Sequence, residues 1–290
     1  MKTACWADRR NIHSGYAVGQ QKGILHTMKR IGFVDYYISE WHANNYPAWF
    51  EEANQKLGLD YKVSYAWAEL DAAPVSGETT DEWCARMGVE HCQTIEELCE
   101  KSDIIVVLAP SNPEKHLQYA KAVLPYGKRT YIDKTFAPDF ATAQEIFAIA
   151  AKYNTPFFSS SALRYAEELA DFAGGNNIIL TGGGRSLEEY SIHLIEMAVS
   201  LLKNPAKRVL VERLGEQRIC HVVSENGSKA AILYSPAMRY SVTANKADGT
   251  LAHQDITSAF FLNLIADMLT FFETGSASFD PGDFRSYEAA

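Results

Sequence analysis

The chain has 290 residues, of which 47% are hydrophobic and 22% charged, a composition typical of a folded globular protein. The net charge of −9, without a long block of Lys or Arg, argues against nucleic acid as a partner. No apolar run approaches the roughly 20 residues that span a bilayer, so we expect no membrane segment. Five cysteines without CxxC spacing argue against a disulfide scaffold or a metal site and favour the reducing cytoplasm.

The first 27 residues have no sustained hydrophobic period and no apolar core of the kind found in secretory signals. We therefore expect residues 1–27 to be an extension outside the folded core. Met28 begins the stretch MKRIGFVDYYI, which leads directly into a predicted strand.

Predicted strands and helices alternate from there to about residue 161. The strands fall at residues 32–39, 61–68, 103–109, 130–133 and 155–160, and the helices at 46–57, 80–87, 94–101, 114–124 and 139–152. The run 103–109 is apolar almost throughout, as expected of a strand buried on both faces of a parallel sheet. The alternation predicts a Rossmann-like, doubly wound parallel α/β domain over residues 28–162.

The pattern changes after residue 162. A helix is predicted at 187–202, strands at 208–214, 218–224, 229–234 and 239–244, and a strongly apolar helix at 256–272. Partial alternation in these strands indicates a sheet with one covered face. We therefore expect an α+β domain over residues 163–290 with a mainly antiparallel sheet, whose other face pairs with a second copy in a homo-oligomer.

A dinucleotide-binding domain carries Gly-x-Gly-x-x-Gly after its first strand, because glycine lets the backbone approach the pyrophosphate. The corresponding stretch here, residues 39–45, reads SEWHANN and contains no glycine. Two interpretations remain open. Ser39, His42 and Asn44 bind a cofactor at the start of a helix, or residues 40–45 form a solvated loop.

Two acids follow the second predicted strand, where a Rossmann fold places the acid that binds ribose hydroxyls. They are Glu69 and Asp71, and they lie about 30 residues after the first strand rather than the usual ~20. We take both as candidate cofactor-binding residues, and they favour NAD over NADP.

Lys134 and His193 are the candidate catalytic residues. Lys134 follows a predicted strand, where a lysine in a cleft can orient a substrate hydroxyl and stabilise alkoxide charge; the alternative is a solvent-exposed lysine. His193 lies inside the helix 187–202, where its ordinary pKa suits proton transfer near neutral pH; the alternative is a core histidine. Glu189, four residues earlier, is placed to orient it.

Four segments occur in an order that matches a known family. They are residues 103–116 (DIIVVLAPSNPEKH), 127–135 (GKRTYIDKT), 157–164 (FFSSSALR) and 183–193 (GGRSLEEYSIH). Over roughly residues 28–205 the chain resembles the glucose–fructose oxidoreductase/inositol dehydrogenase (Gfo/Idh/MocA) family. The resemblance implies a Rossmann domain that holds NAD or NADP, and hydride transfer to or from a small polyhydroxylated, sugar- or polyol-like substrate.

The resemblance also implies roles for individual residues. Lys134 matches the family's conserved lysine and His193 its proton-transferring histidine, and both are expected to contact substrate together with Arg164. The positions that match the nicotinamide side of the cleft are Pro110, Asn112 and His116.

The chain departs from the family pattern at the glycine fingerprint, at Asp133 in place of Glu, and at Thr135 in place of Pro. A cis peptide costs about 3 kcal/mol before a residue other than proline, so we expect the bond between Lys134 and Thr135 to be trans. Two functions stay open: an NAD(P)-dependent oxidoreductase, and a cofactor-free descendant that binds a ligand or a protein partner.

Deletion of residues 1–27 should leave the melting temperature nearly unchanged, because this stretch adds no periodic segment to the core. Thermal unfolding of the shortened and full-length chains, followed by circular dichroism, makes the comparison. Loss of folding in the shortened chain would contradict the prediction.

Overall fold

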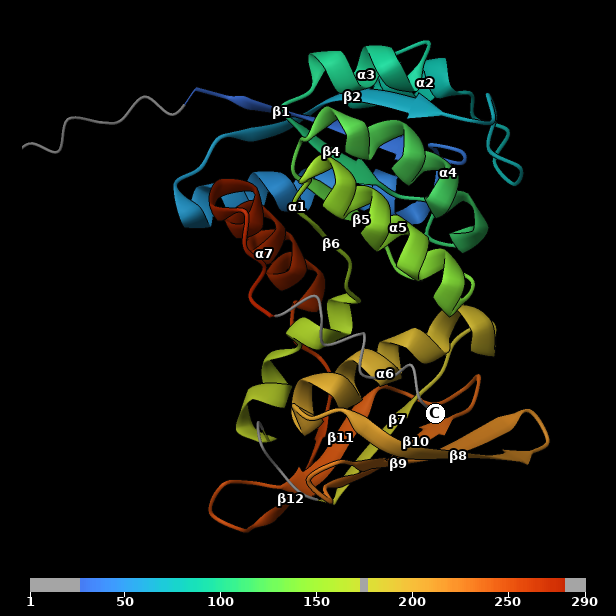
Figure 1. Cartoon of the computed structure of the whole chain (residues 1–290), viewed down its shortest axis with the longest axis vertical. Helices are drawn as coiled ribbons and strands as arrows, with labels where there is room; N and C mark the ends of the chain where they lie inside the picture. Colours follow the sequence, from blue (N-terminus) through green and yellow to red (C-terminus); the bar gives the residue numbers. More distant parts are fainter. Residues whose placement is uncertain (1–26, 173–176, 280–290) are drawn as a thin grey trace, which may run out of the picture.

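The computed structural model of the protein describes residues 27–172 and 177–279. All but the last residue of the predicted extension, residues 1–27, lies outside these ranges, so the extension stays a prediction. The described chain forms two sheets, one above the other in Figure 1, with helix α6 (Leu187–Leu202) between them.

The first sheet contains six parallel strands in the order β3-β2-β1-β4-β5-β6. Their bounds are β1 (Lys29–Asp35), β2 (Tyr61–Ala68), β3 (Glu90–His91), β4 (Ile104–Val107), β5 (Thr130–Ile132) and β6 (Phe157–Phe158). This is the Rossmann order, in which the direction of winding reverses between β1 and β4 and ligands bind at the carboxyl ends of the strands. The predicted doubly wound parallel sheet is confirmed.

Helices cover this sheet, and one of them comes from the far end of the chain. The connecting helices are α1 (Trp41–Leu57), α2 (Thr80–Met87), α3 (Ile95–Lys101), α4 (Pro113–Val123), η1 (Leu124–Tyr126) and α5 (Phe140–Tyr153). Helix α7 (Phe260–Thr274) lies beside α1 (Figure 1), and its Phe271 and Phe272 share a core with Phe33 and Phe50 of the first domain. The chain thus returns to its first domain after the second sheet.

The second sheet follows the order β12-β11-β7-β10-β9-β8, and α6 packs on its inner face. Its strands are β7 (Ile178–Gly182), β8 (Ala206–Leu214), β9 (Gln217–Ser224), β10 (Lys229–Tyr234), β11 (Ser241–Asn245) and β12 (Leu251–Asp255), and η2 (Ala162–Tyr165) and η3 (Glu167–Phe172) precede it. Only β7 and β10 pair in parallel, so the predicted mainly antiparallel sheet is confirmed. Strands β7 and β12 have no counterpart among the strands predicted from the sequence.

Helix α1 begins earlier than the pattern predicts. Residues 40–45 are not a solvated loop, because the helix starts at Trp41. Glu40 is its N-cap, and the Glu40 carboxylate accepts hydrogen bonds from the backbone N–H groups of His42 (2.8 Å) and Ala43 (2.5 Å). A carboxylate in this position satisfies otherwise unpaired N–H groups and is stabilised by the helix dipole.

A buried carboxyl group joins the ends of β1 and β4. Asp35, the last residue of β1, is 1% exposed, and its Oδ1 accepts hydrogen bonds from the backbone N–H groups of Tyr36 (2.7 Å) and Ala109 (3.0 Å). Its Oδ2 has no hydrogen-bond partner within the described ranges. Burial raises the pKa of the Asp35 carboxyl well above its usual range, and the nearby Glu40 acts in the same direction.

Asp35→Asn should change how stability depends on pH. A raised pKa in the folded state means that the contribution of Asp35 is fully present below its unfolded pKa of about 3.9 and is lost as pH rises through the folded pKa. Asparagine keeps the Oδ1 acceptor and cannot ionise. The free energy of unfolding of the variant should therefore increase relative to that of the wild type as pH rises above about 4, by up to about 1.4 kcal/mol per pH unit. Urea unfolding of both proteins at pH 5 and at pH 8 measures the difference between their free energies of unfolding. The same difference at the two pH values would contradict the prediction.

The outer face of the second sheet is exposed. Strand register places Ile179, Ala231, His221 and Leu210 in one row across β7, β10, β9 and β8. Ile179 is 43% exposed and Leu210 is 55% exposed. Such a row of partly apolar side chains on a sheet face is typical of a surface that pairs with another chain.

We therefore retain the prediction of a homo-oligomer joined through this face. Light scattering at micromolar concentration should report a mass above that of one chain, and Ile179→Asp should lower it because a carboxylate in the interface would lose its hydration. Leu57→Asp, at an exposed position of α1, is the matched control and should leave the mass unchanged. A monomeric wild type would overturn the prediction.

Candidate functional site

A cavity of about 770 Å³ lies between the two domains at the carboxyl end of the first sheet. Both domains contribute to its walls, together with the start of α7. The predicted site residues that line it are Ser39, His42, Asn44, Pro110, Lys134, Glu189 and His193. The fold thus brings together residues that are far apart in the sequence.

Lys134 follows β5 and borders the cavity. Its Nζ donates a hydrogen bond to the carbonyl oxygen of Pro110 (3.1 Å), and its backbone N–H donates to Oδ1 of Asp133 (2.8 Å). The peptide bond between Lys134 and Thr135 is cis, so the prediction of a trans bond was wrong. That prediction weighed only the local preference of the chain, which the surrounding tertiary contacts can override.

Asp133 and His42 form a buried pair beside Lys134. Nδ1 of His42 contacts Oδ2 of Asp133, and Oδ1 of Asp133 accepts a hydrogen bond from the hydroxyl of Tyr131 (3.2 Å). Burial alone would raise the pKa of Asp133, but the neighbouring His42 and Lys134 hold it below its usual value. The pair fastens the first turn of α1 to the end of β5.

His193 reaches the cavity from α6. Its Nδ1 lies 2.6 Å from Oγ of Ser161, and its ring packs edge-on against Tyr190 and Tyr240. Burial lowers the pKa of His193 to about 3, and the positive charges of Lys134 and His42 act in the same direction. The imidazole is therefore neutral near pH 7, and the expectation that it titrates there was wrong because it left desolvation out.

Ser161, rather than Glu189, orients the His193 ring. Glu189 lines the cavity, but its carboxylate pairs with Arg185 (3.1 Å) and its backbone N–H binds the Ser186 hydroxyl. Ser161 is the buried N-cap of η2, which packs against α6. Sequence reasoning missed it because nothing in the run of three serines at 159–161 marks one of them as a partner of a distant histidine.

Two of the candidate cofactor-binding residues in this cavity already have partners. The Ser39 hydroxyl donates to the Glu78 carboxylate. Oδ1 of Asn44 accepts hydrogen bonds from the indole N–H of Trp83 (2.9 Å) and the guanidinium of Arg86 (2.9 Å). Their side chains thus anchor α1 to the segment that carries α2.

The remaining candidates do not line the cavity. They are Glu69, Asp71, Asn112, His116 and Arg164. His116 is fully buried, and its two ring nitrogens contact the carbonyl oxygens of Leu108 (2.7 Å) and Phe136 (2.9 Å), which gives it a structural position under the strand ends.

Arg164, Asn112 and Asp71 have contacts outside the cavity. The guanidinium of Arg164 pairs with the buried Glu196 at 2.6 Å, whereas the amide of Asn112 donates to the nearby Glu114 (2.9 Å). Asp71 is exposed, and its backbone carbonyl accepts a hydrogen bond from the N–H of Thr80 (2.7 Å). Arg164 is therefore not placed to contact a ligand in the cavity.

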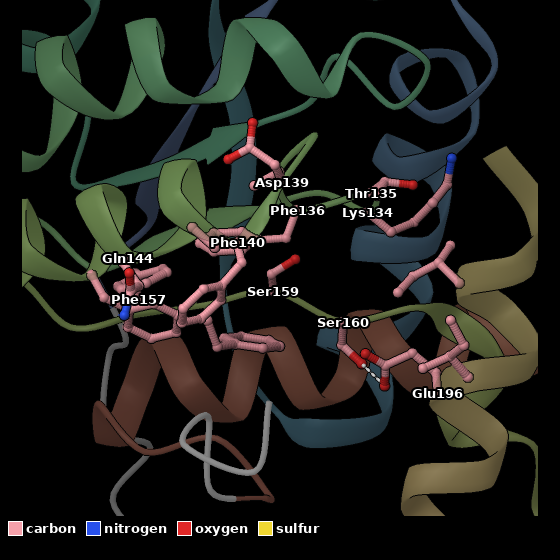
Figure 2. A pocket seen from close by; sticks show the side chains of 16 residues that line it. Lys134, Thr135, Phe136, Asp139, Phe140, Gln144, Phe157, Ser159, Ser160 and Glu196 are labelled. Atoms are coloured by element: carbon pink, nitrogen blue, oxygen red, sulfur yellow. Dashed lines mark hydrogen bonds between the residues drawn. The ribbon is translucent and has the colours of Figure 1, made fainter. Parts of the chain in front are cut away.

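A second cavity, of about 790 Å³, also borders Lys134 (Figure 2). Much of its wall is aromatic and comes from Phe136, Phe140, Phe147, Phe157 and Phe158. At one wall, shown in Figure 2, the Ser160 hydroxyl donates to the Glu196 carboxylate (3.3 Å). So apolar a cavity offers few hydrogen bonds to a polyhydroxylated ligand, and the first cavity is the better candidate site.

Across residues 27–172 and 177–279 there is no group of three or more His, Cys, Asp or Glu that could hold a metal ion. The helices in those ranges are too short or too polar to cross a membrane.

The resemblance to the Gfo/Idh/MocA family raises the question of whether a dinucleotide fits this end of the sheet. Strand β1 ends at Asp35 rather than at the predicted residue 39, so the stretch that corresponds to the fingerprint begins at Asp35 and not at residue 39. Its three glycine positions fall on Asp35, Tyr37 and Glu40. The first N–H groups of α1, which would face the pyrophosphate, bind the Glu40 carboxylate. Glu69, the candidate for the ribose hydroxyls, contacts Lys115 and accepts a hydrogen bond from another side chain. These residues do not fit a dinucleotide in the usual Rossmann position.

The sequence similarity to a known family lies in the part of the first domain that follows α1. Residues 60–160 match the GFO_IDH_MocA model, described as an oxidoreductase family with an NAD-binding Rossmann fold. The uncharacterized oxidoreductase YhhX of Escherichia coli (strain K12) is 34% identical over 56 residues, which are 19% of this chain and 16% of YhhX. That alignment spans about a sixth of the relative's length. At family level these matches support a nicotinamide cofactor without distinguishing NAD from NADP.

Solved structures share the fold over most of the chain. UDP-N-acetylglucosamine 3-dehydrogenase GnnA from Acidithiobacillus ferrooxidans has a TM-score of 0.69 at 11% identity, covering 90% of this chain and 94% of GnnA. Biliverdin reductase from Synechocystis sp. PCC 6803, in complex with biliverdin and NADP+, has a TM-score of 0.62 at 12% identity, covering 89% and 95%. Residues 60–160 therefore match the NAD-binding domain of the Gfo/Idh/MocA oxidoreductases, and the solved structures show that the fold is shared over most of the chain.

Proposed function

We propose that the protein binds a small polyhydroxylated ligand, of the sugar or polyol class, in the cavity between its domains. The observation that carries this proposal is that Lys134, from the end of β5, and His193, from α6, line one cavity. An ammonium group and a neutral imidazole together suit a hydroxyl group, which both accepts and donates hydrogen bonds. The name of GnnA, a sugar-nucleotide dehydrogenase with the same fold, supports the sugar class.

Lys134 and His193 have different parts in this proposal. Nζ of Lys134 has three protons, one of which is directed to the carbonyl oxygen of Pro110, so others can be donated to a ligand oxygen. Nδ1 of His193 is engaged by Ser161, so the ring presents Nε2 to the ligand hydroxyl. Lys134 can therefore donate to the oxygen of a ligand hydroxyl, and the neutral ring of His193 can form a second hydrogen bond with the same hydroxyl.

The other walls of the cavity suit the body of a sugar. Trp41, Tyr190 and Tyr240 offer flat apolar surfaces, against which the C–H face of a sugar ring can pack. Glu189 and Arg185 offer polar groups for further hydroxyls. A few polar groups among aromatic walls are typical of small-molecule sites.

A second candidate function is an NAD(P)-dependent oxidoreductase acting on the same ligand class. The observation that favours it is again Lys134 with His193, because the resemblance implies that the family uses these two residues on the substrate. It ranks second because the fingerprint positions Asp35, Tyr37 and Glu40 do not fit the dinucleotide. Absorbance at the wavelength of reduced nicotinamide, followed with polyols and NAD or NADP, tests it: steady turnover would raise it to first place.

Lys134→Met should weaken ligand binding about 10- to 100-fold, because a charge-assisted hydrogen bond contributes about 1.5–3 kcal/mol. His193→Asn should weaken it about 5- to 10-fold through loss of a neutral hydrogen bond. The probes are myo-inositol, D-glucose and a UDP-hexose. Binding is followed by the fluorescence of Trp41, which lines the cavity and is 52% exposed, and by calorimetry.

Lys62→Met is the matched control. Lys62 is exposed near the start of β2, away from the carboxyl end of the sheet, and its replacement should change the affinity less than about twofold. Equal affinities for the wild type and both site variants, or no binding of any probe, would overturn the proposed function.

A further inference from the structure

The turn between β1 and α1 holds a carboxylate of the chain itself where a Rossmann fold usually holds a pyrophosphate. The Glu40 carboxylate accepts hydrogen bonds from the backbone N–H groups of His42 (2.8 Å) and Ala43 (2.5 Å). These are the donors that a helix N-terminus offers to a phosphate. The anion position at the start of α1 is therefore occupied from within.

Asp35 engages the next donors along the same edge. Its Oδ1 binds the N–H of Tyr36 and the N–H of Ala109, which joins the end of β1 to the chain after β4. A phosphate beside this turn would meet two carboxyl groups, Asp35 and Glu40, and would find these backbone donors engaged. Burial already raises the pKa of both carboxyl groups, so a further negative charge beside them would be costly.

Tyr37 and Glu69 remove two other features that a dinucleotide needs. Tyr37 stands at the second glycine position and lines the cavity with a large side chain, where glycine would let the pyrophosphate approach the backbone. Glu69 is paired with Lys115, and it also accepts a hydrogen bond from Tyr119 (2.9 Å). The ribose-binding position is thus also engaged by the chain's own side chains.

We propose that Glu40 takes the place of the pyrophosphate, so that this protein binds neither NAD nor NADP in the turn between β1 and α1. A dinucleotide would have to displace Glu40 from the helix start and then lie beside it and Asp35. The contacts of the turn alone would exclude the dinucleotide, whichever ligand enters the cavity.

Calorimetric titration of the full chain with NADH, NADPH and ADP-ribose tests the inference. ADP-ribose carries the pyrophosphate and both riboses without the nicotinamide, so it reports on the turn itself. We expect no saturable binding of any of the three up to about 1 mM. Saturable binding of NADH or NADPH by the wild type, displaced by ADP-ribose, would overturn the inference.

Glu40→Gln tests the part assigned to Glu40. Glutamine removes the charge and keeps an oxygen that can cap the helix, so saturable binding of ADP-ribose should appear below about 1 mM. The matched control is Asp139→Asn, which makes the same change at the N-cap of α5, where the Asp139 carboxylate accepts a hydrogen bond from the N–H of Thr142 (2.8 Å). The control should bind no ADP-ribose.

Circular dichroism establishes that the variants fold, and Glu40→Ser, which keeps a capping hydroxyl, replaces Glu40→Gln if the latter does not. A folded, uncharged variant that still fails to bind ADP-ribose would overturn the assignment to Glu40. Titration of the same wild-type sample with myo-inositol, D-glucose and the UDP-hexose separates the two proposals. Failure there contradicts the proposed function alone, whereas NADH binding contradicts this inference alone.

Discussion

Three carboxyl groups, those of Asp35, Glu40 and Asp133, lie at the carboxyl edge of the first sheet, and the site depends on how their charges are balanced. Burial raises the pKa of Asp35 and of Glu40, and the N–H groups at the start of α1 act against this rise in Glu40. His42 and Lys134 hold the pKa of Asp133 below its usual value. Buried like charges so close together require this compensation. The same contacts hold β1, β4, β5 and α1 together at the place where the cavity opens.

The cavity itself results from the way the second domain closes over this edge. Helix α6 brings His193 opposite Lys134, and Ser161, at the start of the connection between the domains, holds the imidazole ring. Helix α7, which follows the second sheet, then packs against α1. The second domain is therefore joined to the first domain both before and after its sheet. Because the site is divided between two domains, its shape depends on their packing as well as on the individual side chains.

The likeness to the Gfo/Idh/MocA family and the departure from it lie in different parts of the first domain. The matched segment, residues 60–160, covers β2 to β6 and begins after the turn that carries Asp35 and Glu40. Strand order in such a domain follows from buried apolar strands joined by crossover helices, and glycines in one turn are not needed for it. The fold can therefore persist while the turn that usually grips a cofactor takes on other contacts.

Hydrophobic periodicity by itself determined the alternation of the first domain, the helix at 187–202 and the mainly antiparallel second sheet, because these patterns are local to each element. The motifs also singled out Lys134 and His193, which share the cavity. Only the tertiary structure decided the early start of α1, the central strand β7, the pairing of His193 with Ser161 and the low pKa of that histidine. Each of these depends on burial or on contacts between segments far apart in the chain, and a pattern of neighbouring residues does not contain that information.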